Sequence, residues 1–126
     1  MTYLLDTNAL LFSFANKKEL SNKAKEIIET EENLCVSIAS LWEIAIKQSI
    51  GKLSVSLTIP EFQSTCNERN IEIIPIRPKE LESIKSLPAI HNDPFDRLII
   101  AQAITMNASI VTRDSQIPKY PVHVEW

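Results

Sequence analysis

The chain is poor in cysteine and histidine, which argues against metal sites built from sulfur and imidazole. Its only cysteines, Cys35 and Cys66, lie far apart and outside any C-x-x-C pattern. Its only histidines, His91 and His123, have no partners at the spacing of zinc ligands. We therefore expect two free thiols that serve as small buried hydrophobic groups.

Long hydrophobic runs and a leader-like N-terminus are also missing. The apolar stretches are too short to cross a bilayer, and residues 1–5 carry no basic side chain before Asp6, which argues against a signal peptide. With 44% hydrophobic and 23% charged residues, the composition is that of a folded globular protein rather than a disordered one. We expect a cytoplasmic protein with no membrane contact.

The chain lacks the basic excess that usually accompanies nucleic-acid binding. Its formal net charge is -3, so its overall electrostatics do not indicate a nucleic-acid partner. A bound divalent cation would offset part of the acidic charge. A local basic patch could still face phosphates, and its candidate members are Lys47, Lys52, Arg97 and Arg113.

Strand-like and helix-like patterns alternate along the 126 residues, which fit a single domain (1–126) without repeats or linkers. Strands are predicted at residues 2–5, 34–37, 71–76 and 109–112, with a short fifth at 122–124. Helices are predicted from residue 9, at 21–28, 38–49, 60–70 and 78–86, and from residue 93. Gly51, the only glycine, is expected to end the helix 38–49. The alternation predicts an α/β fold with three layers, in which helices cover both faces of a parallel sheet of about five strands.

Asp6 and Asp114 stand where apolar strand-like runs end. Ligands of an open parallel sheet bind beyond the carboxyl ends of its strands, so these two aspartates could be neighbours in space. Each is also a common turn or helix-capping residue, and this alternative stays open. Asn8 and Thr112 flank the same positions and could orient carboxylates or waters by hydrogen bonding.

Glu43 lies in the third predicted helix, where most neighbouring residues are apolar. Ser40 and Glu43 match a capping box, and Lys47 is placed for an ordinary i,i+4 ion pair. Because few positions of this helix can face solvent, we favour a partly enclosed, functional carboxylate. Trp42 and Phe95 are expected in the core.

Asp93 and Asp96 open the last long helix. Asp93 followed by Pro94 is a strong helix start, so Asp93 is more typical of a cap than of a ligand. Asp96 shares a helical face with Ile99, Ile100 and Ala103, which must look inward, so this acid needs a partner.

Taken together, the four acids Asp6, Glu43, Asp96 and Asp114 predict a metal site made of oxygen ligands. Isolated buried carboxylates are costly, and oxygen donors select Mg²⁺ or Mn²⁺ over zinc or copper. Such a metal can activate a water and hold a phosphate oxygen, so phosphodiester hydrolysis is the expected reaction class.

The chain resembles the PIN-domain ribonucleases, and among them the VapC-type toxins of bacterial type II toxin-antitoxin systems. The resemblance spans nearly the whole sequence and rests on four motifs in order: Leu4-Leu5-Asp6-Thr7-Asn8, residues 37–47, His91-Asn92-Asp93-Pro94-Phe95-Asp96-Arg97, and Val111-Thr112-Arg113-Asp114. It implies a Mg²⁺- or Mn²⁺-dependent endoribonuclease that acts on RNA, usually dimeric and held inactive by a small antitoxin protein. By motif, Asp6, Glu43 and Asp96 match the three core acids and Asp114 the more variable fourth. Asp93 belongs to the motif, and Asn8 and Thr112 lie beside the acids.

Other readings of the same pattern are weaker. A phosphorelay receiver needs paired acids after its first strand, and a haloacid-dehalogenase-like phosphatase needs a second aspartate where this chain has Asn8. The remaining alternative is a PIN-like module without catalytic activity that binds RNA or a protein.

Overall fold

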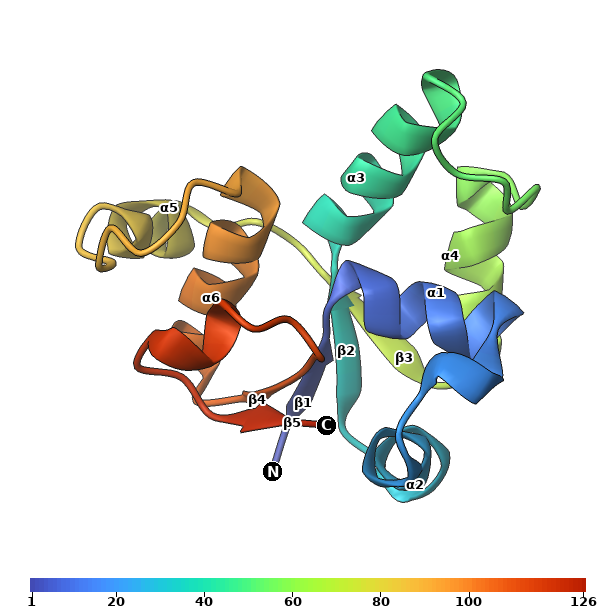
Figure 1. Cartoon of the computed structure of the whole chain (residues 1–126), viewed down its shortest axis with the longest axis horizontal. Helices are drawn as coiled ribbons and strands as arrows, with labels where there is room; N and C mark the ends of the chain where they lie inside the picture. The colour runs from blue at the N-terminus through green and yellow to red at the C-terminus, as the bar shows by residue number, and fades with distance from the viewer.

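A computed structural model describes residues 1–126 and confirms the α/β fold, with a five-stranded parallel sheet in the order β3-β2-β1-β4-β5 (Figure 1). The strands are β1 (Tyr3–Leu5), β2 (Leu34–Ser37), β3 (Ile71–Ile74), β4 (Ser109–Val111) and β5 (Val124–Glu125). The helices are α1 (Thr7–Ala15), α2 (Asn22–Thr30), α3 (Ile38–Ser49), α4 (Ile59–Glu68), α5 (Pro78–Ile84) and α6 (Pro94–Met106), with short 3-10 helices η1 (Lys17–Glu19) and η2 (Ile117–Lys119).

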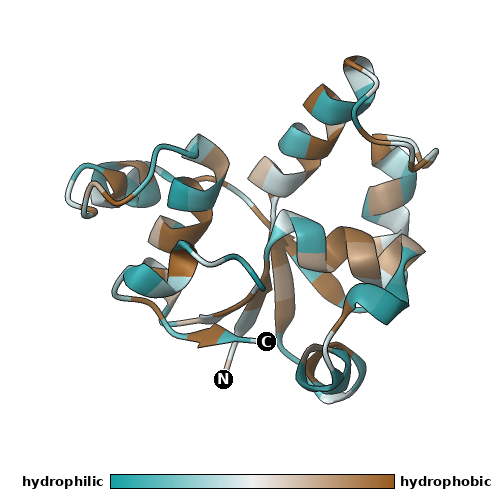
Figure 2. Cartoon of the chain, viewed as in Figure 1, coloured by the Kyte–Doolittle hydropathy of each residue, from teal (hydrophilic) through white to brown (hydrophobic).

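Successive residues of the central strands point into two different cores. Leu5, Val36 and Val111 join one cluster with side chains from α1, α2, α3 and α4. Leu4, Cys35 and Ile110 join a second cluster on the opposite face, where α6 packs. Side chains alternate along a strand, so a buried parallel strand must be apolar at every position. Figure 2 shows hydrophobic residues, in brown, along the central strands and in bands on the surrounding helices.

The order of the strands places the turning point of the chain between β1 and β4. The chain moves outward from β1 through β2 to β3, and then returns through α5 and α6 to β4 on the other side of β1 (Figure 1). Helices leaving β1 and entering β4 therefore lie on opposite faces of the sheet. An open crevice forms at such a switch point, beyond the carboxyl ends of the strands.

Local sequence signals set the helix ends. Ser21, Ser37 and Thr58 cap the N-termini of α2, α3 and α4 through their hydroxyl oxygens. Gly51 follows the last turn of α3 with φ of 71°, a left-handed conformation that suits glycine, as predicted. None of the helices combines the length and apolar character needed to cross a membrane.

The prediction that Trp42 belongs to the core is wrong. Trp42 is 59% exposed, and its ring packs edge-on against Phe95 at 5.2 Å between centroids. Only one side of α3, carrying Leu41 and Ile44, contacts the body of the protein. The opposite side is also apolar, which leaves an exposed row that we call the α3 stripe: Ile38, Trp42, Ile46 and Ile50.

Candidate active site

Strand register brings the first candidate residues together at the carboxyl edge of the sheet. Leu5 of β1 pairs with Val36 of β2 and with Val111 of β4. The next residue of each strand is therefore at the same level, and these are Asp6, Ser37 and Thr112. Ser37 caps α3, so this edge also fixes the start of the helix that carries Glu43.

Asp6 is a buried carboxylate with no basic partner. Its side chain is the N-cap of α1, where Oδ1 accepts the backbone N–H of Ala9 at 2.8 Å and Oδ2 accepts the hydroxyl of Thr112. The pKa of Asp6 is raised from 3.8 to about 6, mainly by burial and to a smaller extent by the negative charges of Asp96 and Asp114, whereas the two hydrogen bonds act in the opposite direction. Asp6 is thus a helix cap, as the alternative to a ligand role proposed. Capping alone does not explain why its carboxylate is buried, because a cap can lie at the surface.

Glu43 is held by side chains rather than by a helix cap. The N-cap of α3 is Ser37, so the alternative of a capping box formed by Ser40 and Glu43 is wrong. Glu43 Oε1 instead accepts the hydroxyl of Thr7 at 2.6 Å, and Oε2 pairs with Lys47 at 3.1 Å, as the i,i+4 spacing predicted. Thr7 directly follows Asp6, so this contact joins α3 to the end of β1.

Asp93 and Asp96 occupy the first turn of α6 in different ways. Asp93 is the N-cap and accepts the backbone N–H groups of Phe95 and Asp96 at 2.9 and 3.0 Å, as predicted. Asp96 Oδ2 lies 3.1 Å from Nε2 of His91, which is the partner that its inward position required. The pKa of Asp96 is raised to about 6, mainly by burial and also by the negative charges of Asp93 and Asp114, whereas the bond from His91 lowers it.

Asp114 lies two residues beyond Thr112 in the loop after β4. Its Oδ1 accepts the backbone N–H groups of Gln116 and Ile117 at 2.7 and 3.1 Å, and its own N–H donates to the Thr112 hydroxyl at 3.0 Å. Thr112 therefore connects Asp6 with Asp114. Asp114 serves as a turn-forming residue, and its charge still acts on both Asp6 and Asp96.

The predicted basic patch is largely engaged elsewhere. Lys47 pairs with Glu43. Arg97 donates to the carbonyl of Pro88 and to the hydroxyl of Tyr120 at 2.8 and 3.0 Å. Arg113 pairs with Glu19 at 3.1 Å and lies over the ring of Phe12. Asn8 is exposed on α1 and makes no side-chain hydrogen bond, so its orienting role stays a prediction.

The carboxylate oxygens suit a hard divalent cation, although the acids are not arranged as a complete set of metal ligands. The negative charges of Asp96 and Asp114 both raise the pKa of Asp6, so these three acids lie near one another, and all three offer oxygen atoms. No group of three or more His, Cys, Asp or Glu side chains is arranged to hold a metal ion as it stands. The chemistry of the residues fits Mg²⁺ or Mn²⁺, and the shared ligand role of Asp6, Glu43, Asp96 and Asp114 stays a prediction.

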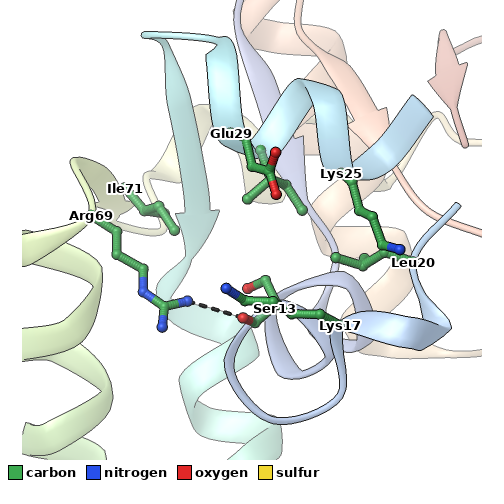
Figure 3. A pocket seen from close by; sticks show the side chains of 8 residues that line it. Ser13, Lys17, Leu20, Lys25, Glu29, Arg69 and Ile71 are labelled. Carbon is green, nitrogen blue, oxygen red and sulfur yellow. Dashed lines mark hydrogen bonds between the residues drawn. The ribbon is translucent and has the colours of Figure 1, made fainter. Parts of the chain in front are cut away.

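The largest cavity lies away from these acids. It has a volume of about 470 Å³ and is lined by residues from the end of α1, η1, α2 and the start of β3, including Ser13, Lys17, Lys25 and Arg69. Figure 3 shows Arg69 donating to the carbonyl of Ser13 across this cavity. Since it lies by the N-terminal end of β3, it does not belong to the carboxyl edge.

Three neighbours of the acids were not assigned a role from the sequence. His91 was visible in the motif that contains Asp96, five residues away, which is the signal that could have identified it. Thr7 follows Asp6 directly and could have been singled out in the same way. Tyr120, which bonds to His91, carries no such signal because only the fold brings it near α6.

These features define a PIN domain, and the chain belongs to the PIN-domain family, whose model matches residues 3–122. Ribonuclease VapC22 of Mycobacterium tuberculosis is 27% identical over 117 residues, which cover 92% of this chain and 89% of that protein.

The solved structures of VapBC2 from Rickettsia felis bound to a promoter DNA fragment and of DNA-bound VapBC from Salmonella typhimurium are also similar. Their TM-scores are 0.70 and 0.71 and their identities are 21% and 17%. The matches cover 99% of this chain in both cases, with 98% and 97% of those chains. The resemblance inferred from the four motifs is confirmed at the level of the family and fold.

Proposed function

We propose that this protein is a metal-dependent endoribonuclease and the toxin component of a toxin-antitoxin pair. The observation that carries the proposal is the pairing of Asp6 and Asp96. Both carboxylates are largely buried, repel each other's charge, and have pKa values raised to about 6. Burying negative charge without a matching cation is costly, so this edge of the sheet favours binding of a divalent cation.

In the proposed site, Asp6, Glu43, Asp96 and Asp114 would hold Mg²⁺ or Mn²⁺. When bound, such an ion polarises a phosphate oxygen and lowers the pKa of a coordinated water. The protein's own contribution is positional: Thr112 directs Asp6 and Asp114, and Thr7 directs Glu43. Lys47, Arg97 and Arg113 border the acids, and their existing contacts leave them a weak role in binding RNA.

The protein partners proposed are a cognate antitoxin and a second copy of the chain. The antitoxin is supported by the similar solved structures, which include DNA-bound VapBC proteins and a toxin-antitoxin complex from Klebsiella pneumoniae. The homodimer is supported by the α3 stripe, because four large apolar side chains at i,i+4 spacing on one helix form a surface suited to packing against another helix.

Cleavage of RNA by the purified protein, freed of any antitoxin, tests the proposal. We expect cleavage with Mg²⁺ or Mn²⁺ and its loss in excess chelator. Asp6→Asn should lower the rate at least about a hundredfold, on the scale of losing a key electrostatic group. Asp93→Asn is the matched control, because Asp93 is also a helix N-cap but is exposed, and it should retain most of the activity.

Two results would contradict the proposal. Cleavage that persists in excess chelator would point to a contaminant or to another mechanism. A protein that binds RNA without cutting it, whatever metal is added, would support the alternative of a PIN-like binding module without catalytic activity.

A further inference from the structure

A chain of hydrogen bonds runs from the core of the protein to the Asp96 carboxylate. Tyr120 is buried, with 3% of its surface exposed, and its ring packs in the cluster formed around α6. The Tyr120 hydroxyl lies 2.7 Å from Nδ1 of His91, and Nε2 of the same ring lies 3.1 Å from Oδ2 of Asp96. The His91 and Asp96 side chains are themselves only 16% and 21% exposed, so water competes little for these bonds.

The donors around Tyr120 decide where the protons lie. The phenol oxygen accepts the backbone N–H of His91 at 3.2 Å and an N–H of Arg97 at 3.0 Å. Its single proton must then be donated, and Nδ1 of His91 at 2.7 Å is a far better acceptor than the His91 carbonyl at 3.5 Å. Nδ1 is therefore the unprotonated nitrogen of the neutral ring, and Nε2 carries the proton that is donated to Asp96.

The same network fixes the segment before α6. The N–H group of Arg97 that reaches Tyr120 also donates to the carbonyl of Pro88 at 2.8 Å, so the turn leading to His91 is tied to the helix that carries Asp96. The His91 and Tyr120 rings also meet edge-on, with 5.4 Å between centroids. The imidazole consequently has little freedom to rotate away from the carboxylate.

We propose that His91 and Tyr120 are positioning residues that hold the Asp96 carboxylate in the orientation needed to bind a divalent cation. The inference rests on the proposed function, since it needs Asp96 to be a metal ligand. Hydrogen bonds to ligand side chains fix their rotamers, and losing such a partner typically weakens metal affinity roughly 10- to 100-fold.

The position of the ring proton can be measured without metal or activity. In a ¹⁵N–¹H correlation spectrum of the metal-free wild type, recorded in mildly alkaline buffer, we expect His91 to be protonated at Nε2 and unprotonated at Nδ1. Tyr120→Phe removes only the hydroxyl, so the Nδ1 resonance should move away from its hydrogen-bonded position. A wild-type ring protonated at Nδ1 would overturn the inference.

Mn²⁺ affinity, measured by calorimetry, tests the consequence for the site. His91→Leu should weaken binding roughly 10- to 100-fold, and His91→Gln should recover most of it because its amide N–H can replace Nε2–H. Tyr120→Phe should have an intermediate effect, and Tyr3→Phe is the control tyrosine, which should bind as the wild type does. Thermal unfolding in chelator establishes that each variant is folded. If His91→Leu is not folded, the Mn²⁺ affinity of Tyr120→Phe and the ¹⁵N–¹H spectrum of the wild type test the inference instead.

The outcomes separate this inference from the proposed function. A wild type that binds no Mn²⁺ and cuts no RNA would contradict the proposed function and this inference with it. A wild type that binds and cuts, with His91→Leu and Tyr120→Phe unchanged in affinity, would contradict this inference alone. An equal loss of Mn²⁺ affinity in His91→Leu and His91→Gln would show that His91 acts only through packing, which would also overturn the inference.

Discussion

Replacing Asp6 by asparagine should make the metal-free protein more stable while lowering the proposed RNA cleavage at least about a hundredfold. Asp6 is 7% exposed, and its pKa is raised to about 6, so the folded chain favours the protonated carboxyl. The stabilisation from this group is complete below the pH of about 4 at which an unfolded aspartate titrates. It is lost as the pH rises through about 6, because the ionised form must then be buried.

The expected magnitude follows from the pKa change. One pH unit corresponds to about 1.4 kcal/mol, so a rise from 3.8 to about 6 costs the folded state roughly 3 kcal/mol at neutral pH. Asparagine avoids this cost and still accepts the Ala9 N–H as an N-cap. Its amide group meets the Thr112 hydroxyl, which must rotate, and we subtract about 1 kcal/mol for that bond. The net gain is roughly 2 kcal/mol, or on the order of 8 °C in Tm.

Thermal and urea unfolding in chelator, repeated across the pH range, measures this gain. Asp6→Asn should exceed the wild type in mildly alkaline buffer, and on the acid side of the titration the order should reverse by about 1 kcal/mol, because only the lost Thr112 bond remains. Mn²⁺ at a hundred times its Kd should reverse the order by adding about 2.7 kcal/mol to the wild type alone. The exposed cap variant Asp93→Asn should gain little. An Asp6→Asn protein that is no more stable than the wild type in alkaline chelator would refute the reasoning.

Three further predictions concern the hydroxyl beside Asp6, the α3 stripe and the core. Thr112→Val removes the donor to Asp6, so the pKa of Asp6 should rise further and RNA cleavage should fall roughly 10- to 100-fold, while Thr112→Ser should restore both. Trp42→Gln should shift sedimentation toward the monomer; an equal shift in Leu81→Gln, which alters a residue 51% exposed on α5, would contradict the interface. Ile99→Ala should cost about 2–5 kcal/mol in urea unfolding because Ile99 is fully buried, whereas Ile104→Ala, at a position 37% exposed on the same helix, should cost much less.

The acids of the candidate site could be predicted from the sequence because each lies beside a local signal. Asp6 ends an apolar strand, and Asp93 and Asp96 follow the start of a helix marked by Pro94. These signals depend on residues that are adjacent in the chain. The sequence placed Thr112 at a strand end, where it could orient a carboxylate, but it could not show that the carboxylate is that of Asp6, 106 positions away.

The errors have a common physical cause. Trp42 was predicted in the core because α3 is apolar on nearly all sides, and periodicity cannot tell which side meets the sheet. The alternative of Ser40 as a cap is also wrong, because the Ser40 hydroxyl lies 3.0 Å from that of Thr7, a contact between two helices. In each case the choice was made by packing between elements.

The sequence by itself determined the α/β alternation, the parallel sheet and most helix starts, and it pointed to the acidic residues of the candidate site, because these depend on side-chain periodicity and on capping by near neighbours. Only the tertiary structure decided that Asp6 and Asp96 share one electrostatic environment and that His91, Tyr120 and Thr112 surround them. The physical reason is that strand order and register bring the ends of β1 and β4 together with the start of α6, and burial there changes the energy of each charge.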